Sequence, residues 1–163
     1  MILPSLNVPS RLVGNFFYFA ADSNYFDLYG KALALSLLQH APWANVHVHL
    51  YNPTNEQLEW CSQKNVSYTD ELIDINNKEF NTLCACIRFI RIPEIFDPSA
   101  NIISFDCDVI ANKTIPLTKF LEATDLSKIT IRKGGKSLAS AISFGPDDFR
   151  NTYSTRLYES FKQ

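Results

Sequence analysis

Residues 102–110 read IISFDCDVI, in which a short apolar run meets two aspartates on either side of a cysteine before the chain turns apolar again. A short apolar run of this kind is typical of a buried strand in a parallel sheet. Along a strand, residues two apart point the same way, so Asp106 and Asp108 are expected to share one face. Two ionised carboxylates this close repel each other, and partial burial adds a desolvation cost. A shared proton, a hydrogen-bond network or a divalent cation would relieve the repulsion.

Strands and helices are expected to alternate on both sides of this motif. The strands are predicted at 15–22, 46–51, 66–69, 102–105, 128–132 and 140–144, and the helices at 24–40, 55–63, 80–92 and 147–161. Thr54 to Gln57, TNEQ, form a capping box that opens the second helix, and Pro93 is expected to stop the third. The alternation predicts an α/β fold with a mostly parallel sheet.

The acidic residues of interest fall at the predicted carboxyl ends of strands. Asp22 ends the first predicted strand, and Asp106 and Asp108 follow the fourth. In open α/β sheets, ligands bind in the crevice outside the carboxyl ends of the strands. The three aspartates are therefore the strongest indication of a binding site in the sequence.

Composition restricts the class of protein. With 163 residues the chain is most simply one domain, 1–163, and its 46% hydrophobic and 20% charged content is that of a folded globular protein. A net charge of −2 gives no general attraction to nucleic acid or to an anionic membrane. No apolar run approaches the roughly 20 residues of a membrane span. The first 15 residues, MILPSLNVPSRLVGN, lack the basic and apolar regions of a signal peptide.

The cysteines are Cys61, Cys84, Cys86 and Cys107. The Cys84-x-Cys86 spacing is too tight for the usual zinc pair, and no second pair follows it. Buried free thiols are the favoured interpretation, which agrees with a reducing, cytoplasmic location.

Three motifs in order resemble those of a known enzyme family. FAADSNYF (19–26), CIRFIRIPEIF (86–96) and IISFDCDVI (102–110) are similar to the motifs of GT-A glycosyltransferases, especially glycosyltransferase family eight. That family has an Ala-Asp-x-Asn-Tyr strand end, an arginine-bearing helix before a Pro-Glu-like turn, and an apolar strand running into Asp-x-Asp. The resemblance is close over residues 15–112 and implies a Rossmann-like GT-A fold, with a mostly parallel mixed sheet flanked by helices.

The resemblance implies roles for particular residues. Asp106 and Asp108 would hold Mn²⁺ or Mg²⁺ against the diphosphate of a nucleotide-sugar, and Arg88 would face that donor as a catalytic residue. The donor-binding residues that it implies are Ala20, Ala21, Asp22, Asn24, Tyr25, Arg88, Cys107 and Ser140. Simpler roles remain open for some of them: one aspartate of the pair capping a turn, Asp22 capping the following helix, and a solvated helix position for Arg88. For Arg91, a solvated helix position is the favoured interpretation.

The implied activity is a metal-dependent transfer of a hexose from a UDP-sugar, with retention of configuration, to an unknown glycan, protein or small-molecule acceptor. The chain departs from the family in two places. The usual Asn-Ala-Gly is replaced by Ala139-Ser140-Ala141, and the late His-x-x-Gly-x-x-Lys motif, with its metal-binding histidine, is absent together with the acceptor region. An apolar edge exposed by that absence would suit pairing of two copies of the chain in a homodimer.

Two other functions are compatible with these residues. A catalytically silent nucleotide-sugar-binding domain would bind UDP with metal but turn over no donor. A haloacid-dehalogenase-like phosphatase also places Asp-x-Asp after an apolar strand, with the first aspartate as nucleophile. Against it, Val109 and Ile110 follow the motif without the expected threonine, and about 100 residues precede a motif that in that family lies near the N-terminus.

Overall fold

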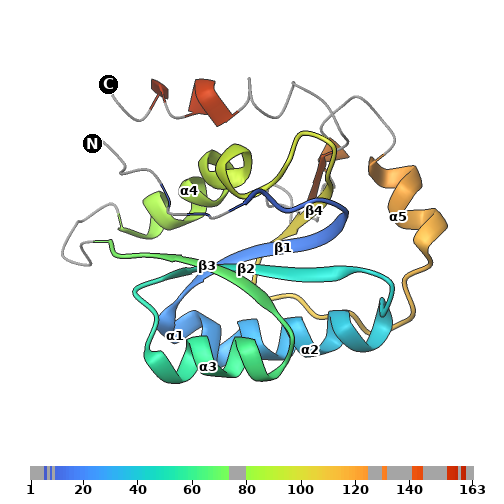
Figure 1. Cartoon of the computed structure of the whole chain (residues 1–163), viewed down its shortest axis with the longest axis horizontal. Helices are drawn as coiled ribbons and strands as arrows, with labels where there is room; N and C mark the ends of the chain where they lie inside the picture. Colours follow the sequence, from blue (N-terminus) through green and yellow to red (C-terminus); the bar gives the residue numbers. More distant parts are fainter. Residues whose placement is uncertain are drawn as a thin grey trace.

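The computed structural model describes most of the chain, and the described residues are 6, 8, 10–73, 80–124, 130–131, 141–144, 154–157 and 159–160. The strands within this part are β1 (Asn15–Asp22), β2 (Asn45–Tyr51), β3 (Ser67–Glu71), β4 (Asn101–Phe105), β5 (Thr130–Ile131) and β6 (Ala141–Phe144). They form one sheet in the order β3-β2-β1-β4-β6-β5 (Figure 1). Strands β1 to β4 are parallel, whereas β6 runs antiparallel to β4 and β5 antiparallel to β6. The predicted α/β fold with a mostly parallel, mixed sheet is confirmed.

Helices cover both faces of the sheet. They are α1 (Ser23–Tyr25), the π-helical turn η1 (Phe26–Gly30), α2 (Lys31–His40), α3 (Asn55–Gln63), α4 (Phe80–Ile95) and α5 (Leu117–Thr124). Helices α1, α2 and α3 lie on one face and α4 on the other, while α5 packs beside β4 and β6 (Figure 1). None of the described helices combines the length and the apolar character that a membrane span requires.

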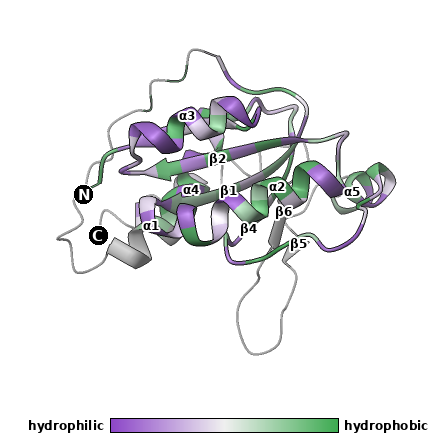
Figure 2. Cartoon of the chain, turned by 90° about the horizontal axis from the view of Figure 1, so that it is seen from below, coloured by the Kyte–Doolittle hydropathy of each residue, from purple (hydrophilic) through white to green (hydrophobic). Residues whose placement is uncertain are grey.

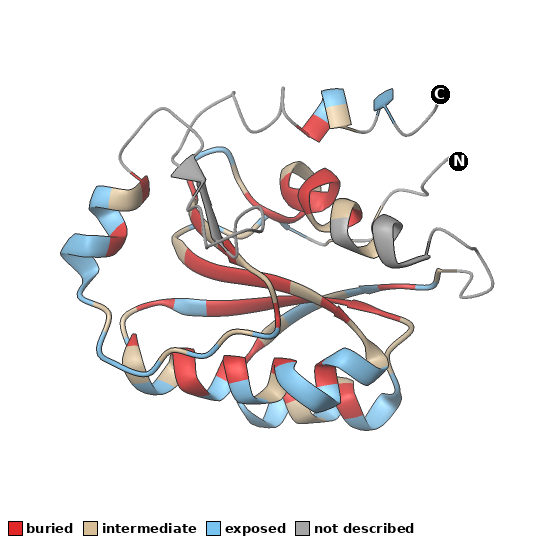
Figure 3. Cartoon of the chain, turned by 180° about the vertical axis from the view of Figure 1, so that it is seen from behind, coloured by how far each residue is buried: buried red, intermediate tan, exposed pale blue. Residues whose placement is uncertain are grey.

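The core consists of two layers that share the central strand β1, and Figure 3 shows its buried residues between the helices. Phe17 and Leu33 of α2 belong to one cluster of buried side chains. Phe16 and Ile92 of α4 belong to a second cluster, and Tyr51 and Ile87 of α4 form a third, smaller one. Because successive side chains of a strand point to opposite faces, the unbroken apolar run of β1 supplies both layers.

The predicted capping box opens α3. The Gln57 backbone N–H donates to Thr54 Oγ1 (3.3 Å), and the Thr54 backbone N–H donates to Gln57 Oε1 (3.0 Å). Gln57 Nε2 also donates to the Ser23 carbonyl oxygen (2.8 Å). Gln57 is one of the buried residues of α3, a helix that carries both hydrophilic and hydrophobic residues (Figure 2), and it therefore ties α3 to the turn that follows β1.

The predicted helix 24–40 is helical throughout but contains the π turn η1. Gly30 ends that turn with ordinary helical dihedral angles, yet a Cβ on it would lie 2.6 Å from Phe26 Cδ2 and 3.2 Å from Phe19 Cε2. Both rings are fully buried. The glycine is therefore needed for close packing of the helix against the rings and not for its backbone freedom.

We expect Gly30→Ala to destabilise the fold by about 1–3 kcal/mol, the usual cost of overpacking a core. This cost exceeds the roughly 1 kcal/mol that alanine gains in helix propensity. Urea denaturation measures the difference, and Gln39→Ala, at an exposed position of α2, is the control. An unchanged or raised free energy of unfolding for Gly30→Ala would show that the rings move aside at no cost.

The expected end of the third helix at Pro93 is wrong, since α4 continues to Ile95. Proline has no N–H for the carbonyl four residues earlier, that of Phe89. The Ser154 hydroxyl donates to that carbonyl oxygen at 2.6 Å, and Ser154 is buried. A side chain distant in sequence thus replaces the helical hydrogen bond that Pro93 removes.

One further element differs from expectation, and another agrees with it where the structure describes it. Helix α5 was not predicted, although Phe120 and Thr124 bury one of its faces. Within the predicted closing helix 147–161, the described residues 154–157 and 159–160 are helical, and the rest lie outside the described part.

Candidate functional site

The strand order reverses between β1 and β4. From β1 the chain adds β2 and then β3 on one side, and it then places β4 on the other side of β1. A crevice opens at such a switch point, outside the carboxyl ends of the strands. Asp22 is the last residue of β1, and Asp106 directly follows β4. The fold therefore brings the predicted acidic residues to the two sides of one crevice.

A pocket of about 370 Å³ lies at this point. Most predicted site residues line it, namely Ala20, Ala21, Asp22, Tyr25, Arg88, Asp106, Cys107 and Asp108. Asn24 is exposed and does not line it, so its predicted role in donor binding has no support. Ser140 lies outside the described residues. The pocket also contains Tyr51 and Cys84, which the sequence did not indicate.

The Asp-Cys-Asp motif forms a turn and not the end of a strand. Because β4 ends at Phe105, the pleat of a strand does not align the two carboxylates as expected, but the turn still brings both to the pocket. Burial, together with the charge of Asp108, raises the pKa of the Cys107 thiol to about 11. The thiol therefore stays protonated at neutral pH and is poorly suited to act as a thiolate ligand or nucleophile.

Arg88 supplies a partner for one of the two carboxylates. Its Nη2 lies 2.5 Å from Asp106 Oδ1, and its Nη1 donates to the Phe105 carbonyl oxygen (3.0 Å). Its Cζ lies 4.6 Å from the centroid of the Phe89 ring. The side chain of Arg88 is 13% exposed, against 37% for Asp106. The fold thus holds the guanidinium firmly, and the guanidinium offsets part of the repulsion within the carboxylate pair.

The donor set fits a hard divalent cation with open coordination positions. Arg88 occupies Oδ1 of Asp106, so Oδ2 and the Asp108 carboxylate would hold the ion. Mg²⁺ and similar ions are commonly bound by one or two carboxylates and complete their coordination with phosphate and water. Within the described residues, no group of three or more histidine, cysteine or acidic side chains is placed to hold a metal.

The other residues that line the pocket are Asp22 and a set of aromatic and small side chains. Asp22 caps α1, with its Oδ1 accepting from the Tyr25 N–H at 2.8 Å, and it also lines the pocket. Its predicted roles as cap and as pocket residue are therefore compatible. Tyr25 is 49% exposed, and its ring centroid lies 5.5 Å from that of Tyr29. Ala20 and Ala21 leave room for a ligand to approach the backbone of β1.

Tyr51 and Cys84 complete this wall. Tyr51 ends β2 directly beside Asp22 in the register of the two strands. Its hydroxyl donates to the Cys84 carbonyl oxygen at 2.9 Å. Burial raises the pKa of the Cys84 thiol to about 12. The spacing of Cys84 four residues before Arg88, one helical turn, is the one signal in the sequence that could have indicated Cys84, whereas Tyr51 is found only through the pairing of β1 with β2.

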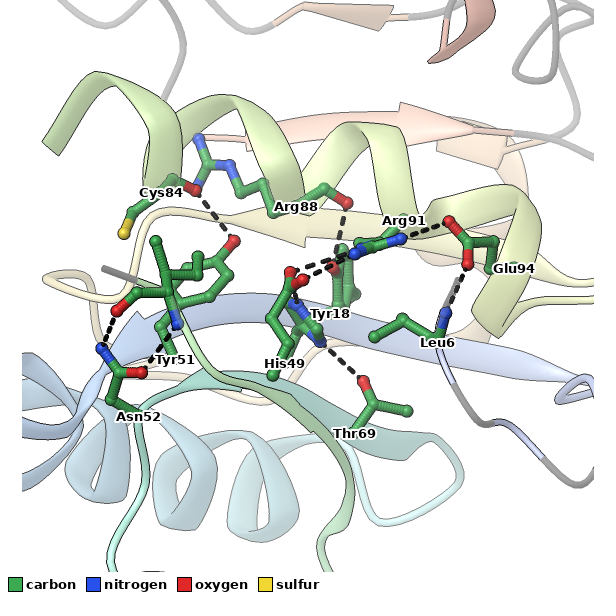
Figure 4. Close-up of polar contacts among 12 residues, drawn as sticks. Leu6, Tyr18, His49, Tyr51, Asn52, Thr69, Cys84, Arg88, Arg91 and Glu94 are labelled. Atoms are coloured by element: carbon green, nitrogen blue, oxygen red, sulfur yellow. Dashed lines mark hydrogen bonds and ion pairs between the residues drawn. The ribbon is translucent and has the colours of Figure 1, made fainter. Parts of the chain in front are cut away.

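A second polar group lies away from the pocket, between the sheet and α4 (Figure 4). We call His47, His49, Glu71 and Arg91 the buried cluster. The cluster contacts are Arg91 Nη2 to Glu71 Oε2 (2.6 Å), His49 Nε2 to Glu71 Oε1 (2.8 Å), His49 Nδ1 to Thr69 Oγ1 (2.8 Å) and His47 Nε2 to Thr69 Oγ1 (3.1 Å). The solvated position expected for Arg91 is wrong, since the residue is 1% exposed.

All four cysteines are free, as predicted. Cys61 and Cys107 are buried, whereas Cys84 and Cys86 are only partly buried.

The comparisons with known proteins are informative about the fold alone. No protein-family model matches the sequence, and no curated protein matches it. Among solved structures, the apo structure of the WbbM bifunctional glycosyltransferase matches with a TM-score of 0.58 and 13% sequence identity. The match covers 94% of this chain and 35% of that chain, so the chain spans about a third of its neighbour's length. Membership of family eight stays a prediction. Over nearly all of its length, the chain shares the fold of a glycosyltransferase.

Proposed function

We propose that the protein is a metal-dependent glycosyltransferase that binds a UDP-sugar and transfers its hexose to an acceptor. The observation that carries the proposal is the chemistry of one pocket at the switch point of the sheet. Arg88 and the two aspartates of the Asp-Cys-Asp motif supply charged groups to its lining, and Tyr25, Tyr51, Ala20 and Ala21 supply aromatic and small apolar ones. A nucleotide-sugar has the matching groups, with an anionic diphosphate joined through ribose to a flat base.

Arg88, Asp106 and Asp108 would bind and orient the diphosphate. Asp106 Oδ2 and the Asp108 carboxylate would hold Mn²⁺ or Mg²⁺, which when bound neutralises charge that develops on a leaving diphosphate. Arg88 has five N–H groups, of which one faces Phe105 and one faces Asp106. It lines the pocket, so its other Nη protons are suited to donate to phosphate oxygens.

Asp22 and the aromatic residues of the pocket would bind the nucleoside. The Asp22 carboxylate is suited to accept from a base N–H or a ribose hydroxyl, and the Tyr25 ring to cover the base. Retention of configuration is implied by the family-eight resemblance alone, and it is not argued from any residue of the pocket. The acceptor, whether glycan, protein or small molecule, is not specified by the described residues.

A silent nucleotide-sugar-binding domain is the second candidate. Within the described part of the chain, no third acidic, histidine or cysteine side chain is placed to join the two carboxylates around the cation, and this favours a silent binder. The phosphatase alternative requires Asp106 as a free nucleophile, whereas Arg88 lies 2.5 Å from it. Slow hydrolysis of a UDP-sugar in the absence of acceptor would distinguish an enzyme from a silent binder.

The test is a thermal-shift titration with UDP, UDP-glucose and UDP-galactose, each with Mn²⁺ and with EDTA. A ligand at about 100 times its Kd should add about 2.7 kcal/mol of stability, and we expect this only when Mn²⁺ is present. Asp108→Ala should remove the metal-dependent shift while the protein stays folded, because Asp108 is exposed. Glu122→Ala, at an exposed carboxylate paired with Lys119, is the control. Failure of all three compounds to stabilise the unaltered protein would refute the proposal.

A further inference from the structure

One turn of α4 forms a wall of the pocket. Cys84 and Arg88 both line it, and they are four residues apart, which places them on one face of the helix. The Arg88 side chain has to reach across to the end of β4 to contact Asp106. The contact between Arg88 and Asp106 therefore depends on where this turn of α4 lies relative to the strand ends.

Two buried tyrosine hydroxyls tie this turn to the sheet (Figure 4). The Tyr18 hydroxyl, from β1, donates to the carbonyl oxygen of Arg88 itself at 2.9 Å. The Tyr51 hydroxyl, from the adjacent strand β2, donates to the carbonyl oxygen of Cys84 at 2.9 Å. Both tyrosines are essentially inaccessible to solvent. The two carbonyls are one helical turn apart, so two neighbouring strands hold consecutive turns of the same helix.

These two hydrogen bonds fix the position of α4 on the sheet more narrowly than the surrounding apolar packing does. Side chains such as Ile92 and Ile95 pack α4 on the sheet through non-directional contacts. A hydrogen bond prefers a narrow range of distance and angle. A carbonyl oxygen has two lone pairs, so it can accept a bond from a tyrosine hydroxyl in addition to the hydrogen bond within the helix. Burial raises the pKa of both tyrosines far above the neutral range, so both hydroxyls keep the proton that they donate.

Arg88 is consequently held at both ends by the strands that border the crevice. Its carbonyl is bonded to Tyr18 of β1, and its guanidinium is bonded to Phe105 and Asp106 at the end of β4. Tyr18 lies directly beside Ser104 in the register of β1 and β4, one residue before Phe105. The two attachment points of Arg88 therefore belong to neighbouring positions of one rigid sheet.

We propose that Tyr18 and Tyr51 are positioning residues for the site. Their hydroxyls set the register of α4 on the sheet, and Tyr18 in particular holds Arg88 where one Nη meets Asp106 and the side chain lines the pocket. The consequence for catalysis rests on the proposed function, because displacement of a positioning group by about 1 Å is enough to cost roughly 100-fold in rate. The positioning of Arg88 by the two tyrosines is a property of the ligand-free protein and does not depend on that function.

The first test uses no ligand. Tyr18→Phe and Tyr51→Phe remove one hydroxyl each and keep the ring. NMR of the full chain, with Arg88 side-chain signals assigned through Arg88→Lys, measures exchange of the guanidinium protons with water. We expect about fivefold faster exchange in Tyr18→Phe, the factor that corresponds to one hydrogen bond of about 1 kcal/mol, and a smaller increase in Tyr51→Phe. Thr124→Val is the matched control, since it removes a buried hydroxyl that donates to the Phe120 carbonyl oxygen of α5 at 3.1 Å. Unchanged exchange in both tyrosine variants would overturn the proposal.

The second test separates positioning from general stability. Binding of UDP with Mn²⁺ is measured for Tyr18→Phe alone and in an Arg88→Gln background. We expect about a fivefold loss of affinity in the first case and no further loss in the second, because Tyr18 acts through Arg88. Equal losses in both backgrounds would show a merely structural role and overturn the assignment. If UDP fails to bind the unaltered protein, the proposed function fails, and the ligand-free exchange measurement decides the role of the tyrosines.

Discussion

Lowering the pH from 7 to 5 is expected to destabilise the fold by about 2 kcal/mol or more. The cause is the buried cluster, in which two histidines lie between the sheet and α4 with almost no exposure to solvent. Burial, followed by the nearby charge of His49, lowers the pKa of His47 to about 3. Burial also lowers the pKa of His49, against the opposing effect of its hydrogen bond to Glu71.

The direction of the effect follows from proton binding in the two states. An unfolded histidine has a pKa of about 6.5, so below this pH the unfolded chain takes up protons that the folded chain does not. Stability is therefore complete above about pH 6.5 and is lost progressively toward the folded pKa of about 3. For His47, each pH unit in this window costs about 1.4 kcal/mol, and the lowered pKa of His49 adds to the loss in the same direction.

The hydrogen-bond pattern explains why neutral histidines suit this position. Burial alone would raise the pKa of Glu71, but hydrogen bonds from His49 and Arg91 outweigh it and lower the pKa, so Glu71 is ionised. His49 Nε2 then donates to Glu71, and its Nδ1 accepts from the Thr69 hydroxyl. The Thr69 oxygen in turn accepts from His47 Nε2. One proton on each histidine therefore satisfies the contacts that link Glu71, His49, Thr69 and His47 Nε2.

Urea denaturation at pH 7, 6 and 5 measures this dependence. His47→Gln should flatten the loss between pH 7 and 5, because it removes one of the two groups that titrate only in the unfolded state. His40→Gln is the matched control, since it leaves the buried cluster intact and should preserve the loss. A free energy of unfolding that is constant from pH 7 to 5 in the unaltered protein would contradict the expectation.

The elements that the sequence predicted well are those whose signals are local. The apolar run and terminal aspartate of β1 give its bounds, 15–22, as the structure has them. The capping box gives the start of α3. Asp22 and Asp106 were expected to converge because the carboxyl ends of parallel strands lie on one edge of a sheet, and the strand order places them on either side of the crevice.

The features that sequence reasoning missed depend on partners far along the chain. Helix α4 passes through Pro93 because Ser154, 65 residues from Phe89, supplies the missing donor. Tyr51 joins the pocket through its register with Asp22, which no pattern within either strand reveals. Arg91 looks like a solvated helix residue until Glu71, 20 residues earlier, is placed against it. Each case is a tertiary contact that overrides a local preference.

The second large effect concerns the ion pair within the buried cluster. We expect Arg91→Met to destabilise the fold by about 3–5 kcal/mol, since it leaves a buried carboxylate without its main counter-charge. Arg91 Nη2 and Glu71 Oε2 are 2.6 Å apart, and both side chains are almost fully buried. A surface pair is a suitable control: Lys119→Met, which removes the exposed partner of Glu122, should cost no more than about 1 kcal/mol.

A double variant separates the loss of a charge partner from the loss of packing. Glu71→Gln keeps an oxygen that accepts from His49 Nε2 but carries no charge. Glu71→Gln combined with Arg91→Met should therefore be more stable than Arg91→Met alone, although it differs from the natural sequence at one more position. Urea denaturation of the single and double variants at pH 7 measures the coupling between the two residues. If the double variant is less stable than Arg91→Met by the full cost of Glu71→Gln, the two effects are additive. Arg91 then stabilises the fold through the packing of its stem and through Glu94, and not through the charge of Glu71.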